Sequence, residues 1–265
     1  MSKIKNNKRN EWKEQIKAHK TTFVVYCILR FFVMIAIVAN VLSGNYESLF
    51  FCVLTLILML VPSFVERKLN IALPTALEIT ILLFIFSAEI LGEMQNYYTK
   101  VPLWDTILHT VNGFLCAAIG FAMVDILNRG TKTKFKLSPF YLAVAAFCFS
   151  MTIGVVWEFF EFGCDVFLHT DMQKDYIVQT ISSVTLNPDG VNKAVMIENI
   201  TNTSVNGNLL PVNGYLDIGL FDTMKDLLVN FVGAVVFSVI GYFYVKSRGK
   251  NSFAKNFIPV PKYRE

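Results

Sequence analysis

The chain has 265 residues, of which 54% are hydrophobic, 14% aromatic and only 17% charged. This composition excludes an ordinary soluble domain and indicates a protein that crosses a membrane several times. The formal net charge of +4 does not indicate a nucleic-acid partner, because the basic residues gather in the two tails and in alternate turns. We therefore expect the lipid bilayer, and no nucleic acid, as the partner of this chain.

Six apolar stretches are long enough to cross the hydrocarbon core of a bilayer, which takes about 20 helical residues each. They cover residues 21–43, 46–65, 73–95, 103–127, 138–163 and 222–246. The sequence therefore predicts an all-α integral membrane protein, a bundle of six transmembrane helices.

Lysines and arginines gather in every second connection between these stretches. The basic segments are the N-terminal tail, the turns at 67–68 and 129–136, and the C-terminal tail. The positive-inside rule places these segments in the cytoplasm, together with both termini. The predicted organisation is a basic amphipathic tail at 1–20, spans one to five at 21–163, an extracytoplasmic loop at 164–221, span six at 222–246 and a cytoplasmic tail at 247–265.

The outer loop is rich in Asn, Thr, Gly, Asp and Val, unlike the rest of the chain. Its β-branched stretch at 176–186 ends at a turn signal at 187–190, and a second β-like run covers 193–200. Asn-Gly pairs at Asn206 and Asn213 mark further turns. We expect a small antiparallel hairpin or meander in this loop.

Eight ionisable side chains occur where four of the predicted helices approach the outer side of the membrane. They are Glu89, Asp105, His109, Glu158, Glu161, Asp165, Asp222 and Asp226. An ionisable group at the centre of a bilayer costs about 3 kcal/mol on insertion scales, so such groups are rare and usually functional. Because spans three and five run outward and spans four and six run inward, all eight reach one depth. We interpret this group as the functional site.

The spacing of these residues agrees with that interpretation, because residues three or four apart share one face of a helix. The sets are Asp105, His109 and Asn112 in span four; Glu158, Glu161 and Asp165 in span five; and Asp222, Asp226 and Asn230 in span six. Each helix can therefore point its polar face into the bundle. Gly113 and Gly233 continue two of these faces and would let the helices approach closely.

Seven carboxylates at close quarters repel each other, so either some of them stay protonated or cations neutralise them. Oxygen donors with one imidazole suit divalent Mg, Mn, Fe or Zn. We expect His109, Glu158, Glu161 and Asp226 as metal ligands, Asp105 and Asp222 as catalytic carboxylates, and Glu89, Asp165, Asn112 and Asn230 as further lining residues.

Simpler interpretations exist for several of these residues. Asp222 alternatively caps the sixth helix, and Asp105 does the same for the fourth. Asp165 alternatively lies solvated in the headgroup layer, and His109 taken alone is more often a core histidine. Capping does not explain the four expected ligands, which lie a turn or more inside the apolar boundary.

Two other charges are expected at a similar depth in their spans, about three turns from the cytoplasmic side. Arg30 in span one and Glu78 in span three are expected to form an ion pair within the bilayer. Alternatively, the Arg30 side chain extends to the membrane surface. Trp157 is expected near the outer boundary, as part of an aromatic belt.

Three motifs follow one another along the chain: Trp104-Asp105-x-x-x-His109-x-x-x-Gly113-Phe114, Trp157-Glu158-x-x-Glu161 and Asp222-Thr223-x-x-Asp226. Together they resemble the signature of the YjdF-like family of bacterial inner-membrane proteins, over roughly residues 75–245. The resemblance implies a multi-pass protein of the bacterial plasma membrane and no particular activity. Family members often have Tyr in place of Trp104 and a much shorter loop before the last span. The Asp105-x-x-x-His109 spacing is also weakly similar to a motif of VanZ-like membrane proteins.

Three functions compete on this evidence. The first is a metal-dependent membrane hydrolase for a lipid or lipid-linked substrate, with an activated water as nucleophile and Asp105 or Asp222 as general base. The second is a proton- or metal-coupled transporter or permease, which the scarcity of polar residues further inward disfavours. The third is a non-catalytic sensor or partner subunit that uses the outer loop as its contact surface.

Overall fold

The computed structural model describes residues 20–129, 136–247 and 252–262. The chain divides into two compact units, which are taken here one at a time. Unit 1 comprises residues 1–152 and 229–265, and unit 2 comprises residues 153–228. Nearly all of the tail predicted at 1–20 and most of the basic turn at 129–136 lie outside the described residues.

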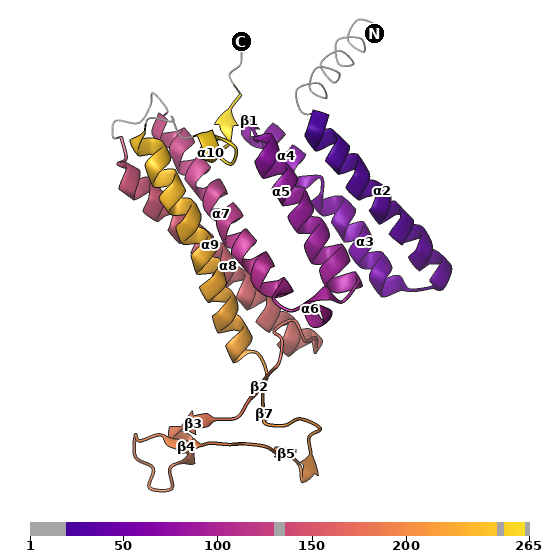
Figure 1. Cartoon of the computed structure of the whole chain (residues 1–265), viewed down its shortest axis with the longest axis vertical. Coiled ribbons are helices and arrows are strands. Elements are labelled where there is room, and N and C mark those ends of the chain that lie inside the picture. The colour runs from indigo at the N-terminus through magenta and orange to yellow at the C-terminus, as the bar shows by residue number, and fades with distance from the viewer. Residues whose placement is uncertain (1–19, 130–135, 248–251, 263–265) are drawn as a thin grey trace, which may run out of the picture. The chain divides into compact units, whose positions relative to one another are not determined.

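Six helices in the described part of the chain are long and apolar enough to cross a membrane, which confirms the predicted fold class (Figure 1). The helical elements are α2 (Lys20–Ser43), α3 (Tyr46–Leu58), α4 (Val61–Leu69), α5 (Thr75–Phe86), the π-helix η1 (Ser87–Met94), α6 (Tyr97–Lys100), α7 (Trp104–Arg129), α8 (Pro139–Leu168), α9 (Leu220–Lys246) and α10 (Ser252–Lys255). The boundary between the two units crosses α8 and α9.

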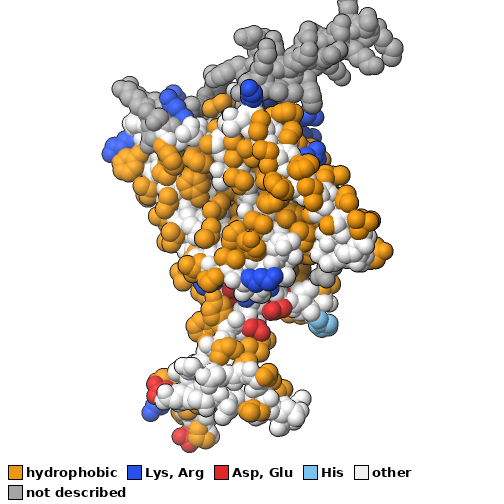
Figure 2. Space-filling view, turned by 45° about the vertical axis from the view of Figure 1, so that its right-hand side comes forward, with side chains coloured by type: hydrophobic (Ala, Val, Ile, Leu, Met, Phe, Trp, Pro, Cys, Tyr) orange, Lys and Arg blue, Asp and Glu red, His pale blue; other side chains and the backbone are white. Residues whose placement is uncertain are grey.

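The outward side chains of the unit 1 helices are mostly apolar, as expected for a surface that contacts lipid. Phe31 is 63% exposed and Phe50 is 62% exposed. Hydrophobic side chains cover the visible helical surface, and Lys and Arg side chains gather at one end of it (Figure 2). The interior contains Ala117, Ala118 and Phe121, all fully buried. Small residues let helices pack closely where the hydrophobic effect between them is weak.

Two of the predicted spans are interrupted. In span two, α3 ends at Leu58 and α4 begins at Val61, because Pro62 in the first turn of α4 lacks the N–H that a continuous helix requires. Residues Ser48–Lys68 are still long and apolar enough for one span. Span three begins as α5 and continues as the π-helix η1.

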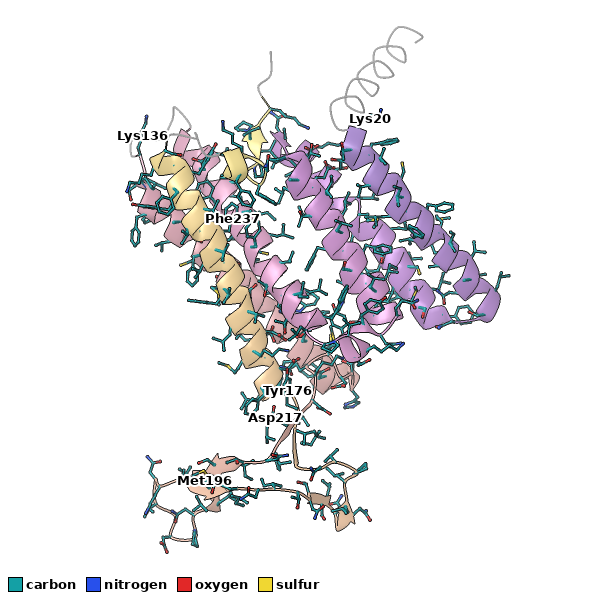
Figure 3. All side chains as sticks on the ribbon, viewed as in Figure 1. Lys20, Lys136, Tyr176, Met196, Asp217 and Phe237 are labelled. Atoms are coloured by element: carbon teal, nitrogen blue, oxygen red, sulfur yellow. The ribbon has the colours of Figure 1, made fainter. Side chains whose placement is uncertain are left out.

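The C-terminal segment of unit 1 packs against the turn between α4 and α5. Strand β8 (Val260–Pro261) pairs antiparallel with β1 (Ile71–Ala72), and the ammonium of Lys262 lies 3.3 Å from Glu66 Oε2. Figure 3 shows Lys20 and Lys136 at the same end of the helices. We call this the basic end of unit 1.

Unit 2 contains the loop between α8 and α9, and its strands pair in three separate antiparallel ladders. These are β2 (Tyr176–Val178) with β7 (Tyr215–Asp217), β3 (Ile181–Ser183) with β4 (Val195–Ile197), and β5 (Ser204–Val205) with β6 (Asn208–Leu209). A 3-10 helix, η2 (Val184–Leu186), follows β3.

The predicted hairpins are present in part. The two β-like runs meet as β3 and β4, and the Asn206-Gly207 turn joins β5 to β6 with positive φ at both residues, as a tight hairpin turn requires. However, Tyr176–Val178 leaves the first run and pairs with β7, about 40 residues later.

Arg30 makes a contact that was not predicted. Its guanidinium carbon lies 4.6 Å from the centroid of the Tyr26 ring, one turn earlier on α2. This is a cation–π contact within one helix. The ion pair of Arg30 with Glu78 stays a prediction.

Candidate functional site

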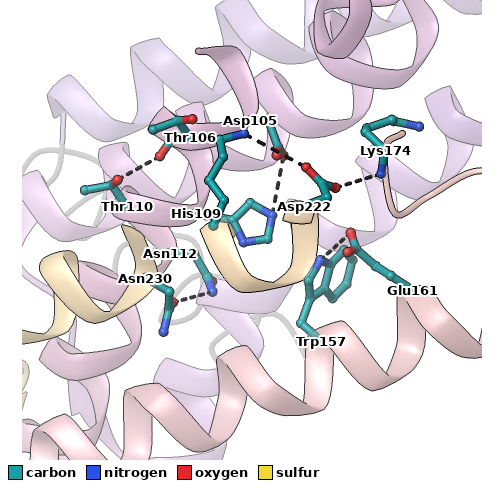
Figure 4. Close-up of polar contacts among 11 residues, drawn as sticks. Asp105, Thr106, His109, Thr110, Asn112, Trp157, Glu161, Lys174, Asp222 and Asn230 are labelled. Carbon is teal, nitrogen blue, oxygen red and sulfur yellow. Dashed lines mark hydrogen bonds and ion pairs between the residues drawn. The ribbon is translucent and has the colours of Figure 1, made fainter. Parts of the chain in front are cut away.

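In unit 1, the first two turns of α7 carry an acid–histidine pair. His109 Nε2 lies 3.4 Å from Asp105 Oδ1, and the two side chains are 11% and 18% exposed respectively. The spacing of four residues places both on one face of the helix (Figure 4). A carboxylate at one imidazole nitrogen orients the ring and leaves the other nitrogen as a potential metal ligand.

The next turn of α7 touches α9 through backbone atoms. A Cβ on Gly113 would collide with the carbonyl oxygen of Asn230, and a Cβ on Gly233 would collide with the carbonyl oxygen of Thr110. Ser150 on α8 adds a hydrogen bond of 2.8 Å to the Gly113 carbonyl oxygen. Glycines at these two positions therefore allow an α7–α9 approach that no larger residue permits.

Polar side chains line this crossing point within unit 1. Asn112 Nδ2 donates a hydrogen bond of 3.3 Å to Asn230 Oδ1 (Figure 4). Cys116 Sγ donates to Asn112 Oδ1 at 3.5 Å, and Asn230 Nδ2 lies 3.6 Å from Met151 Sδ. Asn230 is buried, so this chain of contacts satisfies amide groups that would otherwise cost free energy inside the protein. The structure thus brings two of the predicted lining residues together.

Glu89 lies in the π-helix η1, which contacts α7 within unit 1. A π-turn inserts one residue into the helical ladder and occurs often at functional sites. The helix packs tightly here, because a Cβ on Gly92 would collide with the Tyr98 ring. The sequence did not predict this distortion.

In unit 2, the second half of α8 carries two buried carboxylates. Glu158 and Glu161 are 4% and 8% exposed. The indole Nε1 of Trp157 donates a hydrogen bond of 2.8 Å to Glu161 Oε1 (Figure 4). Trp157 was expected only as part of an aromatic belt, although its spacing of four residues from Glu161 was a signal for this contact.

Asp165 binds the loop that follows α8. Its Oδ1 accepts hydrogen bonds from Thr170 Oγ1 at 2.8 Å and from the Met172 amide at 2.6 Å, and its Oδ2 accepts one from the Gln173 amide at 2.8 Å. Through these hydrogen bonds, both oxygens of the carboxylate hold the chain that follows α8. These contacts give Asp165 a structural role in this loop.

Asp222 lies in the first turn of α9 and contacts the loop that precedes this helix. Its Oδ2 accepts a hydrogen bond of 2.7 Å from the Lys174 amide, and the Lys225 ammonium lies 4.0 Å from its Oδ1. At the start of α9, Asp217 Oδ2 accepts a hydrogen bond of 2.9 Å from the Phe221 amide. Asp217 therefore supplies a capping contact that was not predicted, and the Asp222 carboxylate joins the loop to the start of α9.

Asp226, one turn further along α9, is only 1% exposed. A carboxylate at that burial requires polar or ionic partners. In the nearby loop, burial, together with the negative charges of Asp171 and Asp217, raises the pKa of Asp175 above its ordinary value. That group favours its protonated form more than a free aspartate does.

The structure thus gives each predicted residue a definite position. Within unit 1 it joins Asp105 to His109 and Asn112 to Asn230. Within unit 2 it assigns loop-folding contacts to Asp165 and Asp222 and a tryptophan partner to Glu161. The Asp217 cap and the Cys116 contact were not predicted.

These features define a multi-pass α-helical membrane protein with buried carboxylates and an acid–histidine pair. A family model with the description "Predicted membrane protein (DUF2238)" matches residues 24–247. The chain belongs to this family of predicted membrane proteins.

Among curated proteins, an uncharacterized protein of Thermotoga maritima is 27% identical over 107 residues. The match covers 40% of this chain and 53% of that protein, so the chain spans about half the length of this relative. No solved structure matches the chain. The weak similarity to VanZ-like proteins gains no support from these comparisons.

Proposed function

We propose that this protein is a membrane-embedded hydrolase that uses a divalent metal ion and acts on a lipid or lipid-linked substrate. The observation that carries this proposal is the Asp105–His109 pair, one turn from the glycine crossing of α7 and α9. An ionisable pair at this place is costly in a bilayer, so such pairs are rare and usually functional.

The crossing also supports Asp226 as a partner of this pair. Within unit 1, α7 and α9 run in the same direction and meet where Gly113 contacts Asn230 (Figure 1). His109 precedes Gly113 by four residues on α7, and Asp226 precedes Asn230 by four on α9. Because four residues make about one helical turn, each residue lies one turn before the crossing on its own helix, and Asp226 is therefore the α9 ligand of the proposal.

The donor set fits a divalent cation. The ligands of the proposal are His109, Asp226, Glu158 and Glu161. Asp105, which can also offer a ligand atom, remains a catalytic carboxylate in the proposal. Carboxylate oxygens with one imidazole suit Zn, Mn, Mg or Fe. When bound, such an ion supplies Lewis acidity that makes water a nucleophile near neutral pH.

The two proposed catalytic carboxylates differ in what they contact. Asp222 accepts a hydrogen bond from the Lys174 amide, so its carboxylate is engaged in holding the loop. Asp105 contacts His109 and is therefore the better candidate for general base, or for orienting the imidazole. Glu89 and the Asn112–Asn230 pair line the proposed site.

The proposed substrate class follows from the membrane setting. The eight ionisable residues lie in or next to helices that are long and apolar enough to cross a bilayer. A substrate that reaches them without leaving the membrane is a lipid or carries a lipid anchor. We further propose that the matched family is the YjdF-like family, since its three motifs all lie within residues 24–247. A bacterial plasma membrane and cytoplasmic termini belong to the same proposal.

Reconstitution into proteoliposomes tests the enzymatic function against the transporter alternative. We expect release of a water-soluble headgroup from a lipid pool, its loss on chelation and its return when Mn²⁺ or Zn²⁺ is added. His109→Ala should abolish the release, whereas His169→Ala, at an exposed position, should not. Metal uptake into the vesicles without lipid turnover would instead identify a permease. The Asn112–Asn230 pair gives that alternative a polar group one turn further inward.

A further inference from the structure

A hollow opens on the lipid-facing surface of unit 1 between the start of α8 and the last turns of α9. Its volume is about 360 Å³, and its walls include Phe140, Val144 and Phe147 from α8 and Val239, Tyr242 and Phe243 from α9. Almost all of its lining is apolar or aromatic. We call this hollow the α8–α9 groove.

The dimensions of the groove match one lipid chain in one leaflet. Phe140 and Phe147 are seven residues apart on α8, which at 1.5 Å per residue is about 10 Å along the helix. Half of a bilayer's hydrocarbon core is about 15 Å thick. The groove therefore follows most of an acyl chain and does not continue into the other leaflet.

Two lysines lie where the headgroup of such a lipid would be. Lys136 is exposed just before α8 begins at Pro139, at the basic end of unit 1 (Figure 3). Lys246 ends α9, and its ammonium lies 5.5 Å from the ring centroid of Tyr242, which is itself part of the groove wall. Basic pockets between transmembrane helices bind the phosphates of anionic lipids.

We propose that the α8–α9 groove binds one anionic phospholipid, with an acyl chain against the aromatic walls and the phosphate between Lys136 and Lys246. The apolar wall alone would accept any lipid. The two positive charges favour an anionic one, such as phosphatidylglycerol, over phosphatidylcholine. This site is independent of the acid–histidine pair and of the proposed hydrolysis.

Native mass spectrometry of the delipidated full-length chain tests this proposal with phosphatidylglycerol and phosphatidylcholine of equal chain length. One phosphatidylglycerol should bind to each chain. A lysine near an anionic group contributes roughly fivefold in affinity, so the double variant Lys136→Gln/Lys246→Gln should bind it roughly thirtyfold more weakly. Its affinity for phosphatidylcholine should be unchanged.

A second variant tests the groove wall without changing charge. Val144→Trp fills the groove and should abolish phosphatidylglycerol binding. Val38→Trp makes the same substitution at an exposed position on α2 and should leave the lipid bound. Equal melting temperatures check that both variants fold. Equal binding of the two lipids, or full retention by Val144→Trp, would overturn the proposal. A dimer that forms without lipid and is lost in Val144→Trp would also overturn it, since a second copy would then occupy the groove.

Discussion

The backbone carbonyl of Asn230 occupies the space that a Cβ on Gly113 would need. This contact fixes the approach of α9 to α7 one turn from the Asp105–His109 pair. The asparagine side chain reinforces it through its hydrogen bond with Asn112. Helix packing and the polar contacts at the crossing therefore both depend on Asn230.

Gly113→Ala should destabilise the protein. The added methyl group has no space against the Asn230 carbonyl, and overpacking of this kind costs about 1–3 kcal/mol. Gly163→Ala is the matched control, because a Cβ there meets no atom within 4 Å on the same type of helix. Alanine favours a helix over glycine by up to about 1 kcal/mol, so the control should be neutral or stabilising. Thermal unfolding in detergent measures both, and equal melting temperatures would contradict the crossing contact.

Asp165→Asn should loosen the chain that follows α8. The Asp165 carboxylate accepts backbone hydrogen bonds from Met172 and Gln173 on its two separate oxygens. Asparagine keeps one of these oxygens, and its amide nitrogen cannot accept the other hydrogen bond. Hydrogen bonds to charged groups contribute about 1.5–3 kcal/mol, so limited proteolysis of the loop should be roughly tenfold faster. Asp189→Asn, at an exposed turn, is the control and should be cleaved at the wild-type rate. No acceleration in Asp165→Asn would show that these contacts do not hold the loop.

Arg30 should be energetically coupled to Tyr26, because its guanidinium lies over the Tyr26 ring. In a double-mutant cycle with Arg30→Gln and Tyr26→Leu, the interaction energy should be about 0.5–1 kcal/mol, typical of a cation over an aromatic ring. Apparent unfolding temperatures in detergent measure the cycle. Additive effects of the two substitutions would contradict the cation–π contact. A second cycle with Arg30→Gln and Glu78→Gln tests the ion pair expected from the sequence, and additive effects there would refute that pair.

Cysteines introduced one at a time at Lys136 and Asn192 should react with a labelling reagent from opposite sides of the membrane. Both positions are exposed, and they lie on either side of the span Pro139–Leu168. A membrane-impermeant maleimide added to intact cells should modify Asn192→Cys but not Lys136→Cys until the cells are opened. The wild-type chain gives the background from its five native cysteines. Labelling of both positions from outside would refute the predicted orientation.

The sequence predicted the six helices well, because about 20 consecutive apolar residues have few alternatives to a span. It could not predict the π-helix at Ser87–Met94, since one inserted residue in a helical ladder leaves the composition unchanged. The pairing of Tyr176–Val178 with Tyr215–Asp217 also depends on chain segments far apart in the sequence. Short β-like runs carry no information about such distant partners.

The candidate site was predicted as a set of residues but not in its local contacts. The spacing of Asp105 and His109 was enough to place them together. By contrast, the hydrogen bond from the Phe221 amide to Asp217 was not predicted, because it depends on α9 beginning at Leu220, two residues before the predicted start. A shift of one or two residues at a helix end decides which side chains meet the free backbone amides.

The most direct test of the metal-dependent function is the metal content of the protein purified without chelator, measured by inductively coupled plasma mass spectrometry. We expect a stoichiometric divalent metal in the wild-type chain, in the exposed-residue control His169→Ala and in Glu198→Gln. His109→Ala and Glu161→Gln should lose the metal while keeping a cooperative unfolding transition. A wild-type chain without metal, or metal retained at the wild-type level in His109→Ala, would contradict the proposed site.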